Sequence, residues 1–353
     1  MDSSRPTLDQ VAAAAGVSRA TASRAINGGN KVSPDAQAAV DAAIARLGYI
    51  PNRAARSLVT KRADSIGLII PEPDERVLSD PFFASVIRGL NVALKGTEIQ
   101  LVLLIAQPGD PASRLARYLN NGHLDGAIVV SHHKGDEYED VIAGSRIPCV
   151  IMGRPFDTAR GLTYIDMQNR AGGQLATEHL IAQGRTNIAH IGGPQDMTAG
   201  VDRKKGWRDA LKGAGLVPGP VVTGDFTTVA GYEGMTEILE QDPSIDAVFA
   251  GSDLIALGAI QVLRERGLRI PQDIAIVGFD NLGVSATTDP PLTSVTNSVK
   301  EMARWAANEL LIKVGYFAEG HLPGDLSIEG VVRAEGAVVL PAVLIERESS
   351  GVS

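Results

Sequence analysis

Residues 7–27 have the sequence TLDQVAAAAGVSRATASRAIN, and the rest of the chain is organised around this stretch. Its first half carries apolar side chains at the i, i+3, i+4 and i+7 spacing of one helix face, at Leu8, Val11, Ala12 and Ala15. Thr7 and Gln10 form a capping-box pattern before that face, and Gly16 marks a turn after it. Ser18 is a suitable cap for a second helix. The stretch therefore predicts two short helices joined by a tight turn.

The second helix of this pair has a small apolar face and a polar face. Its inner positions are Ala22, Ala25 and Ile26. Its outer positions combine arginine with small and hydrogen-bonding side chains, at Arg19, Ala20, Ser23, Arg24 and Asn27. Such a helix suits the major groove of DNA, where arginine recognises guanine. An ordinary helical hairpin with a solvated basic face fits the same residues, so this stretch alone leaves both interpretations open.

Net charge separates this head from the rest of the chain. The whole sequence of 353 residues has a formal charge of −8, which is unusual for a protein that binds nucleic acid. Residues 1–62, however, contain nine Lys or Arg and four Asp or Glu, whereas the remainder contains 24 and 37. A basic head on an acidic body indicates that only the head meets phosphate groups.

Residues 33–65 complete the head and connect it to the body. The Ser-Pro-Asp sequence at 33–35 predicts the start of a third helix that ends at Gly48. The residues at 52–59 favour a short basic helix, which would not be stable alone in water. This segment is either a flexible basic linker or a helix that folds on contact with DNA or with a dimer partner.

From Ser65 onward, short apolar runs alternate with amphipathic helical stretches. The run SIGLIIP at 65–71 is the first strand, and FFASVIRGLNVALK at 82–95 is the first helix. Repeated alternation of this kind predicts parallel sheets covered by helices on both faces, here in two doubly wound lobes. Residues 295–317 are expected to form one further helix, and residues 329–350 two short strands. Ligands of such lobes bind in the crevice at the carboxyl ends of the strands.

The sequence shows no targeting, membrane or catalytic motif. No apolar run reaches the roughly 18 residues of a membrane helix, and the start, MDSSRPTLDQ, lacks the apolar core of a signal peptide. We therefore expect a cytoplasmic protein that contacts no membrane. The patterns GxSxG, HExxH and GxxxxGK[ST] are absent, as is any cluster of Cys and His. We therefore expect neither an enzyme nor a protein with a cofactor or metal.

The head and the body together are similar to one protein family. In the body the similarity is carried by the segments DPFFASVIRGL, LDGAIVVS, HLIAQGRTNIAHIGGP, RKKGWRDAL, DAVFAGSDLIALGAI, PQDIAIVGFDN and DPPLTSV. From about Thr7 to about Glu348, the chain resembles the LacI/GalR family of bacterial transcription regulators. The resemblance implies an all-α helix-turn-helix head with a hinge helix, followed by a two-lobed α/β effector domain like the type I periplasmic binding proteins.

The same resemblance implies domain boundaries. The helix-turn-helix DNA-binding domain is expected at residues 1–50, the hinge helix or linker at 51–63, and the effector-binding and dimerisation domain at 64–348. Within the last of these, the N-lobe is expected at 64–164 and 297–325, and the C-lobe at 165–293 and 327–345.

Positions that match the family's DNA contacts fall on the second helix and on the hinge. Arg19, Ala20 and Arg24 match positions that contact base edges, where each arginine can donate two hydrogen bonds to guanine. Phosphate and nearby contacts are implied for Thr7, Ser18, Thr21, Ser23 and Asn27. Leu58 matches the family's minor-groove wedge, which kinks DNA at a cost of a few kcal/mol that contact area offsets. The hinge residues beside it are Asn52, Ala55 and Arg56.

In the body, the resemblance implies a small-molecule effector bound between the lobes. Arg203 and Asp280 match the family's effector-binding arginine and aspartate, a pair that suits hydroxyl groups. Phe226 matches an aromatic contact position, and a flat ring stacks well on a sugar face. Further candidate contacts are Phe82, Phe83, His132, Arg154, Ser252, Asp253 and Asn297. His132 and its neighbour His133 end a strand at the crevice, and for each a ligand contact and an ordinary core or solvent-facing position stay equally open.

The function implied by the resemblance is repression of sugar-utilisation genes, relieved when a mono-, di- or oligosaccharide binds. A homodimer on a near-palindromic operator is also implied, and not a tetramer, because the sequence has no C-terminal leucine heptads. Within the family, a purine or nucleoside effector and a corepressor or activator role stay open. The remaining alternative is a sugar-binding protein without DNA function, against which the basic head and the missing signal peptide argue.

Overall fold

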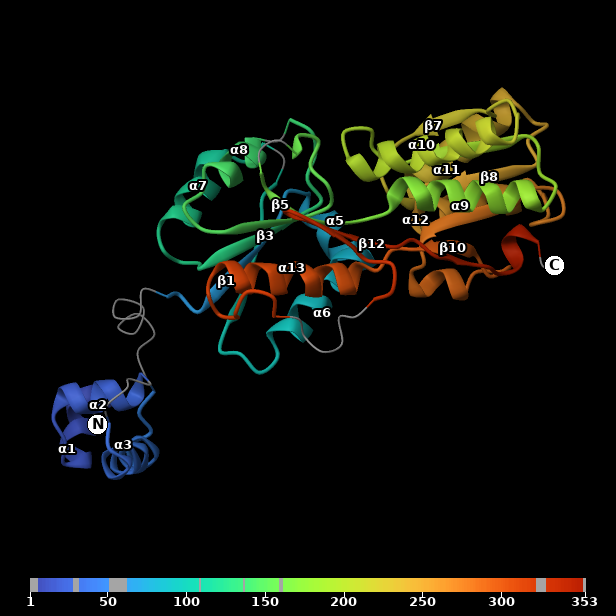
Figure 1. Ribbon diagram of the computed structural model, residues 1–353. Coiled ribbons are helices and arrows are strands. Elements are labelled where there is room, and N and C mark those ends of the chain that lie inside the picture. The colour runs from blue at the N-terminus through green and yellow to red at the C-terminus, as the bar shows by residue number, and fades with distance from the viewer. Residues whose placement is uncertain are drawn as a thin grey trace. The chain divides into compact units, whose positions relative to one another are not determined.

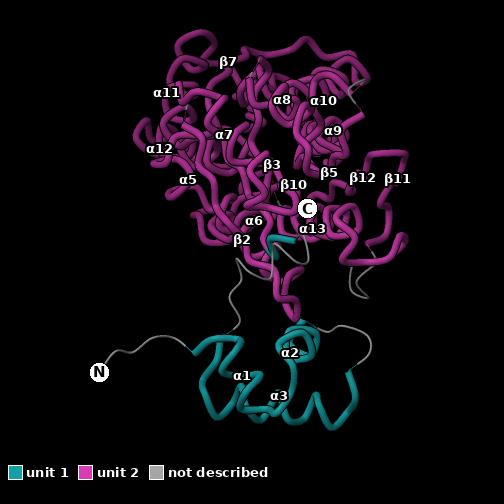
Figure 2. Tube along the Cα trace, turned by 90° about the vertical axis from the view of Figure 1, so that its left-hand side faces the viewer, with its two compact units in different colours: residues 1–64 teal, residues 65–353 magenta. Residues whose placement is uncertain are grey.

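The computed structural model describes residues 6–27, 32–50, 62–107, 109–135, 137–158, 161–321 and 328–351. The chain divides into two compact units, residues 1–64 and residues 65–353 (Figure 2). Most of the hinge predicted at 51–63 lies outside the described residues, and so do its four predicted DNA contacts, Asn52, Ala55, Arg56 and Leu58.

In the first unit, the described residues form the helices α1 (Leu8–Ala15), α2 (Arg19–Ile26) and α3 (Pro34–Leu47). The predicted capping box is present, since Thr7 Oγ1 accepts the Gln10 N–H at 3.3 Å and Gln10 Oε1 accepts the Thr7 N–H at 2.8 Å. Gly16 ends α1 in the left-handed conformation, with φ of 66°. Ser18 caps α2 by accepting the Thr21 N–H at 3.0 Å.

The three helices pack on a small core of Val11, Ala12, Ala22, Ala25, Val40 and Ala43. This arrangement confirms the two apolar faces predicted for the first two helices. Arg19, Ala20 and Arg24 lie on the opposite, exposed side of α2. A core built mainly from alanine and valine buries little apolar area, as expected for a domain of this size.

The second unit contains two mostly parallel sheets (Figure 1). Their strands are β1 (Ser65–Ile70), β2 (Gln100–Ile105), β3 (Gly126–Val130), β4 (Cys149–Met152), β5 (Thr163–Met167), β6 (Ile188–Gly192), β7 (Val221–Thr223), β8 (Ala247–Ala250), β9 (Ala275–Asp280), β10 (Thr293–Thr296), β11 (Val332–Ala334), β12 (Ala337–Leu340) and β13 (Leu344–Ile345). The first lobe has a seven-stranded sheet in the order β11-β12-β5-β4-β3-β1-β2, and the second lobe a six-stranded sheet in the order β13-β10-β9-β8-β6-β7. The predicted two-lobed α/β architecture is thereby confirmed.

Helices cover both sheets, as Figure 1 shows for α13 on the first lobe and α9 on the second. Their bounds are α5 (Asp74–Ser79), α6 (Pro81–Leu94), α7 (Ala112–Asn120), α8 (Glu137–Ala143), α9 (Asn169–Ala182), α10 (Thr198–Gly213), α11 (Thr228–Gln241), α12 (Asp253–Glu265) and α13 (Val299–Lys313). Short 3-10 helices follow at Gly283–Ala286 and Glu348–Ser350. The strands bury continuous apolar runs, such as GAIVV in β3, because helices pack on both faces.

Several short elements differ from the sequence prediction. Strand β5 occupies a stretch expected to be a loop, and β10 overlaps the start of the helix predicted at 295–317, so that α13 begins only at Val299. Both strands are short and partly polar, TYIDM and TSVT, so their apolar signal is weak. Strand β7 and helices α5 and α8 are likewise absent from the prediction, and the C-terminal run forms three strands in place of two.

The sheet order corrects part of the predicted assignment of residues 327–345 to the C-lobe, because residues 332–340 belong to the first lobe. Strand β12 pairs in parallel with β5 of the first lobe, from Ala337 opposite Tyr164 to Leu340 opposite Met167. Strand β11 adds to β12 in antiparallel fashion, and within this range β13 joins the second lobe. The apolar run of β12 covers the edge of β5, which would otherwise expose unpaired backbone groups.

Close packing of α9 on α10 positions the side chains between the lobes. A Cβ atom at Gly173 would come within 2.3 Å of the Arg203 carbonyl oxygen, and one at Gly206 within 2.1 Å of the Arg170 carbonyl oxygen. A larger residue at either place would force the two helices apart. Because neither glycine has a side chain, the backbone of α10 around Arg203 can lie close against α9.

Candidate functional site

A cavity lies at the carboxyl ends of strands from both sheets, where doubly wound folds bind ligands. It contains about 800 Å³ of empty space, which includes open solvent at its mouth. The residues expected to contact an effector that line this cavity are Phe82, His132, Arg203, Phe226, Ser252, Asp280 and Asn297.

Arg203 is the central charged group of the cavity. Its side chain is 5% exposed, and Nη1 lies 3.2 Å from Asp280 Oδ1. The same nitrogen donates to the Gly251 carbonyl at 2.7 Å. The guanidinium carbon lies 3.7 Å from the ring centroid of Phe279 and 5.3 Å from that of Phe226. These contacts hold the planar guanidinium in one orientation, and its stacking on aromatic rings adds to the hydrogen bonds.

Asp280 ends strand β9 in an uncommon backbone conformation, with φ of 101°. Its Oδ1 accepts a hydrogen bond from Asn297 Nδ2 at 3.0 Å in addition to the contact with Arg203. Burial raises the pKa of the Asp280 carboxyl, and the Arg203 guanidinium and the Asn297 hydrogen bond oppose this change. Backbone strain of this kind is concentrated at functional sites.

Three buried polar atoms on the cavity residues lack a hydrogen-bond partner within the described part of the chain. One is Arg76 Nε, on a guanidinium that already pairs with Glu72, and the other two are His132 Nδ1 and Asn297 Oδ1. Burial lowers the pKa of His132 to about 4, so this imidazole is neutral at neutral pH. An unpaired buried polar group costs about 1–3 kcal/mol. A hydroxyl group of a ligand in the cavity would remove that cost at His132 Nδ1 or at Asn297 Oδ1.

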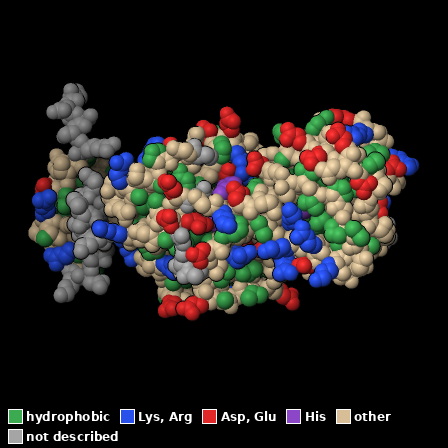
Figure 3. Space-filling model, turned by 90° about the horizontal axis from the view of Figure 1, so that it is seen from above, with side chains coloured by type: hydrophobic (Ala, Val, Ile, Leu, Met, Phe, Trp, Pro, Cys, Tyr) green, Lys and Arg blue, Asp and Glu red, His purple; other side chains and the backbone are tan. Residues whose placement is uncertain are grey.

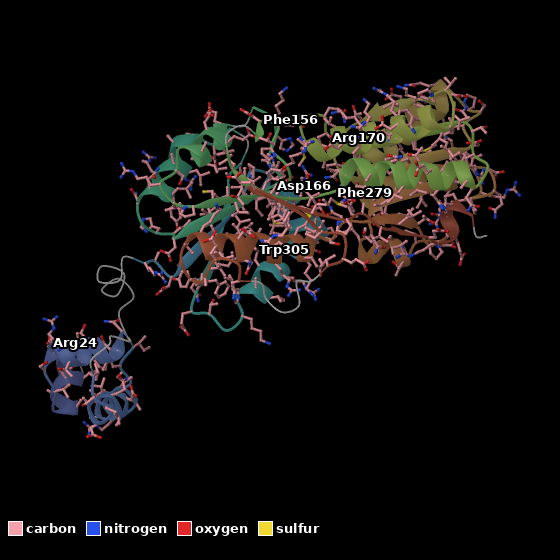
Figure 4. The ribbon with its side chains drawn as sticks, in the orientation of Figure 1. Arg24, Phe156, Asp166, Arg170, Phe279 and Trp305 are labelled. Carbon is pink, nitrogen blue, oxygen red and sulfur yellow. The ribbon has the colours of Figure 1, made fainter. Side chains whose placement is uncertain are left out.

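Asp166 and Asn169 also line the cavity, although neither is expected from the sequence. Figure 4 labels Asp166 where the two lobes meet. Asn169 connects it to Arg203, because Nδ2 donates to Asp166 Oδ1 at 3.1 Å while Oδ1 accepts from Arg203 Nε at 3.0 Å. Burial raises the pKa of Asp166 to about 6. A carboxylate near the carboxyl end of a strand is the sequence feature that could have predicted Asp166 as a cavity residue. That prediction requires β5 to be assigned as a strand first.

The remaining predicted effector contacts, Phe83, Arg154 and Asp253, do not line the cavity. Phe83 is 1% exposed and packs into the core of the first lobe, whereas the adjacent Phe82 faces the cavity. Arg154 follows β4 and forms an ion pair with Asp202 of α10, which connects the two lobes. Phe83 and Arg154 therefore make contacts within the protein that leave neither side chain free to bind a ligand in the cavity.

Asp253 is fully buried behind the cavity wall. Its carboxylate accepts the Leu282 N–H at 2.7 Å and the Ser294 hydroxyl at 2.6 Å. Burial, and next the negative charge of Asp280, raise the pKa of Asp253 to about 7. Asp253 therefore supports the loop that follows β9 and has no access to a ligand in this arrangement.

His133 connects the lobes beside the cavity. Its Nε2 lies 3.1 Å from Glu72 Oε1 of the first lobe, and its Nδ1 lies 3.0 Å from Asp196 Oδ2 of the second. Glu72 is buried and also pairs with Arg76 at 2.8 Å. The hydrogen bond to Glu72 makes the largest contribution to raising the pKa of His133, which reaches about 9. The imidazole is therefore cationic at neutral pH and links two carboxylates of opposite lobes.

Stability of the second unit is expected to fall as pH rises through the alkaline range, because His133 then loses its charge. Its folded pKa of about 9 exceeds the ordinary value of 6.5, so the stabilisation is fully present below pH 6.5 and is lost as pH passes 9. Thermal unfolding of wild type and His133→Asn at about pH 6 and about pH 10 measures this. The variant should have the lower midpoint at the acidic pH and match the wild type at the alkaline one. An equal difference at both pH values would contradict the assignment.

The described part of the head presents the predicted base-contacting residues to solvent. Arg24 Nε donates to the Ala20 carbonyl at 3.1 Å, and Arg19 Nε lies 3.2 Å from Asp9 Oδ1 on the exposed surface. The predicted phosphate contacts lie on α2 or at the helix caps, at Thr7, Ser18, Thr21, Ser23 and Asn27. On the second unit, the face shown in Figure 3 carries both acidic and basic side chains.

Among the described residues there is neither a membrane-crossing helix nor a metal-ion cluster. No helix there combines the length and the apolar character needed to cross a membrane. No three His, Cys, Asp or Glu side chains in the same residues are grouped to hold a metal ion.

Comparison with known protein families and relatives accounts for both parts of the chain. Residues 7–52 match the bacterial regulatory proteins of the lacI family, and residues 63–330 match the periplasmic binding proteins and sugar binding domain of LacI family. The HTH-type transcriptional regulator CelR of Thermobifida fusca is 43% identical over 88% of this chain and 92% of its own length. The ribose operon repressor of Escherichia coli is 34% identical over 87% and 93%, and PurR of Haemophilus influenzae is 34% identical over 89% and 93%.

Solved structures show the same fold. A complex of the transcriptional regulator CelR with cellobiose superposes with a TM-score of 0.74 at 39% identity, covering 98% of this chain and 100% of the other. The lac repressor dimer bound to operator and the anti-inducer ONPF gives a TM-score of 0.83 at 24% identity, covering 99% and 100%. The second likeness concerns the fold alone.

Proposed function

The chain belongs to the LacI family of bacterial regulatory proteins, and on that premise we propose that it is a repressor released from its operator by a carbohydrate of the cellobiose class. Family membership makes it a DNA-binding transcriptional regulator and not an enzyme. The effector, the direction of its effect and the residues that contact it are the proposed part.

The arrangement around Arg203 and Asp280 is the observation that carries the choice of a carbohydrate. Sugar hydroxyls both donate and accept, so a fixed guanidinium beside a carboxylate can bind them through paired hydrogen bonds. Phe226 lines the same cavity and offers a flat ring for a sugar face. His132 Nδ1 and Asn297 Oδ1 provide two more polar atoms. An aromatic ring and several polar atoms in the lining of one cavity suit a neutral, polyhydroxylated ligand.

The relatives support a particular carbohydrate class. CelR, for which a cellobiose complex has been solved, is 43% identical to this chain, whereas the ribose operon repressor and PurR are each 34% identical. Family membership alone does not choose among effectors, because all three proteins belong to it. The higher identity to CelR favours cellobiose or a similar short oligosaccharide over ribose or a purine.

We further propose that the protein acts as a homodimer on a near-palindromic operator, because a two-fold dimer presents two heads to two half-sites. In this arrangement the domain at 1–50 and the hinge at 51–63 contact DNA, while the domain at 64–348 binds the sugar. Release of the operator requires that the sugar bind the DNA-free arrangement of the lobes more tightly than the DNA-bound one. The interlobe contacts of His133 and Arg154 are suited to respond to such a change.

A thermal-shift screen of the full chain tests the effector class. Cellobiose, ribose and the purine bases guanine and hypoxanthine are compared, since a ligand that binds only the folded state raises the unfolding midpoint by mass action. At about 100 times its dissociation constant, a ligand stabilises by about 2.7 kcal/mol, which is a shift of several degrees. We expect cellobiose to give this shift. A shift with a purine base and none with any sugar would overturn the proposal.

A further inference from the structure

We propose that Arg347, in the C-terminal segment, is a positioning residue for the cavity loop Asp280–Leu282. Arg347 is not among the cavity-lining residues, so it would act on an effector only through that loop. The inference rests on the proposed function in one respect, namely that the cavity containing Asp280 is where the effector binds.

The loop Asp280–Leu282 contributes both of its end residues to the cavity wall. Its backbone is held in a region that side chains other than glycine rarely adopt, with φ of 101° at Asp280 and 46° at Asn281. Such a conformation persists only where surrounding contacts over-determine it. Asn281 follows Asp280 directly, so the contacts that hold Asn281 in its conformation also determine how the Asp280 carboxylate is oriented toward Arg203.

Arg347 fixes the side chain of Asn281. Its Nη2 donates to Asn281 Oδ1 at 2.7 Å, and its Nη1 donates to the Leu292 carbonyl at 2.6 Å. The two acceptors lie at the two ends of the connection between β9 and β10. One planar guanidinium therefore joins both ends of that connection. A fork of this kind is specific to arginine, because a lysine ammonium cannot present two fixed parallel donors.

The segment that carries Arg347 is itself firmly attached to the second lobe. Ser349 and Ser350 are completely buried. The Arg347 N–H donates to Thr293 Oγ1 at 2.8 Å, and the same hydroxyl donates to the Arg347 carbonyl at 2.8 Å. Ser349 Oγ donates to the Ile276 carbonyl at 2.7 Å. The backbone at Arg347 is therefore a fixed base from which its side chain reaches the loop.

The other side of the loop is held from within the lobe. Ser294 Oγ accepts the Asn281 N–H at 3.0 Å and donates to the buried carboxylate of Asp253 at 2.6 Å. Asp253 in turn accepts the Leu282 N–H at 2.7 Å. These contacts fix the loop backbone, and Arg347 supplies the charged contact to the Asn281 side chain. Without it, Asn281 loses a charge-assisted hydrogen bond and the uncommon backbone conformation loses part of its support.

Two measurements on the full-length protein test this role. Hydrogen–deuterium exchange of the ligand-free protein reports on the loop itself, and calorimetric titration with cellobiose reports on the cavity. For Arg347→Ala we expect amide exchange at residues 280–282 to rise about tenfold or more, with little change in the β-strands of the lobe. We expect cellobiose to bind about tenfold more weakly, the loss that one charge-assisted hydrogen bond predicts.

Ser349→Ala is the matched control within the same segment. It removes the hydrogen bonds to the Thr293 N–H and the Ile276 carbonyl, but it keeps the two hydrogen bonds that join the Arg347 backbone to Thr293 Oγ1 and both contacts of the Arg347 guanidinium. We expect it to lower the unfolding temperature while leaving cellobiose affinity within about twofold of wild type. Should Arg347→Ala fail to fold, Arg347→Lys replaces it, with about threefold weaker binding expected, since a lysine can keep one of the two hydrogen bonds.

The inference is overturned if the Arg347 variant leaves exchange at 280–282 unchanged, or if both variants weaken cellobiose binding equally. Failure of the wild-type protein to bind cellobiose would instead refute the proposed function. In that case the exchange comparison between the Arg347 and Ser349 variants alone decides whether Arg347 positions the loop.

Discussion

Replacement of Arg203 by alanine is expected to abolish the response to the effector while operator binding is kept. The guanidinium is 5% exposed and lies close to the Asp280 carboxylate, to the cavity ring of Phe226 and to the buried ring of Phe279. Loss of the guanidinium removes the paired charge-assisted hydrogen bonds proposed to the sugar hydroxyls, each worth about 1.5–3 kcal/mol, so cellobiose affinity should fall by about two orders of magnitude or more. Calorimetric titration measures the affinity for cellobiose, and fluorescence anisotropy with operator DNA measures whether operator binding is kept.

This variant needs two controls, because it also leaves Asp280 buried without its cation. Breaking a buried pair destabilises a protein by about 3–5 kcal/mol, so the unfolding midpoint has to be recorded alongside binding. Phe226→Ala removes a cavity wall without removing a charge, and it should weaken cellobiose binding with a smaller loss of stability. Arg170→Ala removes an arginine whose ion pair with Asp209 lies at the surface, and neither binding nor induction should change. The effector assignment is wrong if Arg203→Ala responds to cellobiose as the wild type does.

Replacement of Arg24 by alanine is expected to reduce specific operator binding by about tenfold to a hundredfold, the loss typical of one bidentate contact to guanine. Arg24 is exposed on α2, and its Nε donates to the Ala20 carbonyl four residues earlier in the same helix, so the fold of the head should be unaffected. Binding to unrelated DNA should weaken much less, because that binding depends on charge alone. Anisotropy titrations with operator and with unrelated duplex, at matched salt, give the ratio of the two dissociation constants for each variant.

Arg46→Ala is the control for Arg24→Ala, because it removes the same charge from the same unit. Arg46 is exposed at the end of α3 and donates to the Ala14 carbonyl at 3.2 Å. Its loss should affect operator and unrelated DNA to the same small extent, of about threefold or less. If Arg24→Ala and Arg46→Ala reduce operator binding equally, Arg24 contributes charge and not base recognition.

The features predicted correctly from the sequence are those that depend on local chemistry. The capping box of Thr7 and Gln10 and the turn at Gly16 follow from neighbouring residues alone, and both are present. The two-lobed α/β body follows from the alternation of apolar runs and helices. Three of the predicted residues that line the cavity, His132, Ser252 and Asp280, lie at or just beyond the ends of β3, β8 and β9, which have a strong apolar signal.

The features missed depend on long-range contacts. Strand β5 is partly polar and becomes a strand because β4 and β12 pair with its two edges, and without β5 the position of Asp166 has no structural context. Which of Phe82 and Phe83 faces the cavity depends on the rotation of α6 against the sheet, which adjacent identical residues do not reveal. Likewise, nothing local connects Arg347 to Asn281, because 66 positions separate them in the sequence.

In vitro selection from randomised double-stranded DNA, with and without cellobiose, tests the central claim most directly. The claim is that the head binds a specific sequence and that a carbohydrate in the cavity controls this binding. We predict enrichment of a near-palindromic sequence without sugar, and loss of that enrichment at a cellobiose concentration that raises the unfolding midpoint. No enriched sequence, or an enrichment that the same cellobiose concentration leaves unchanged, would contradict the claim.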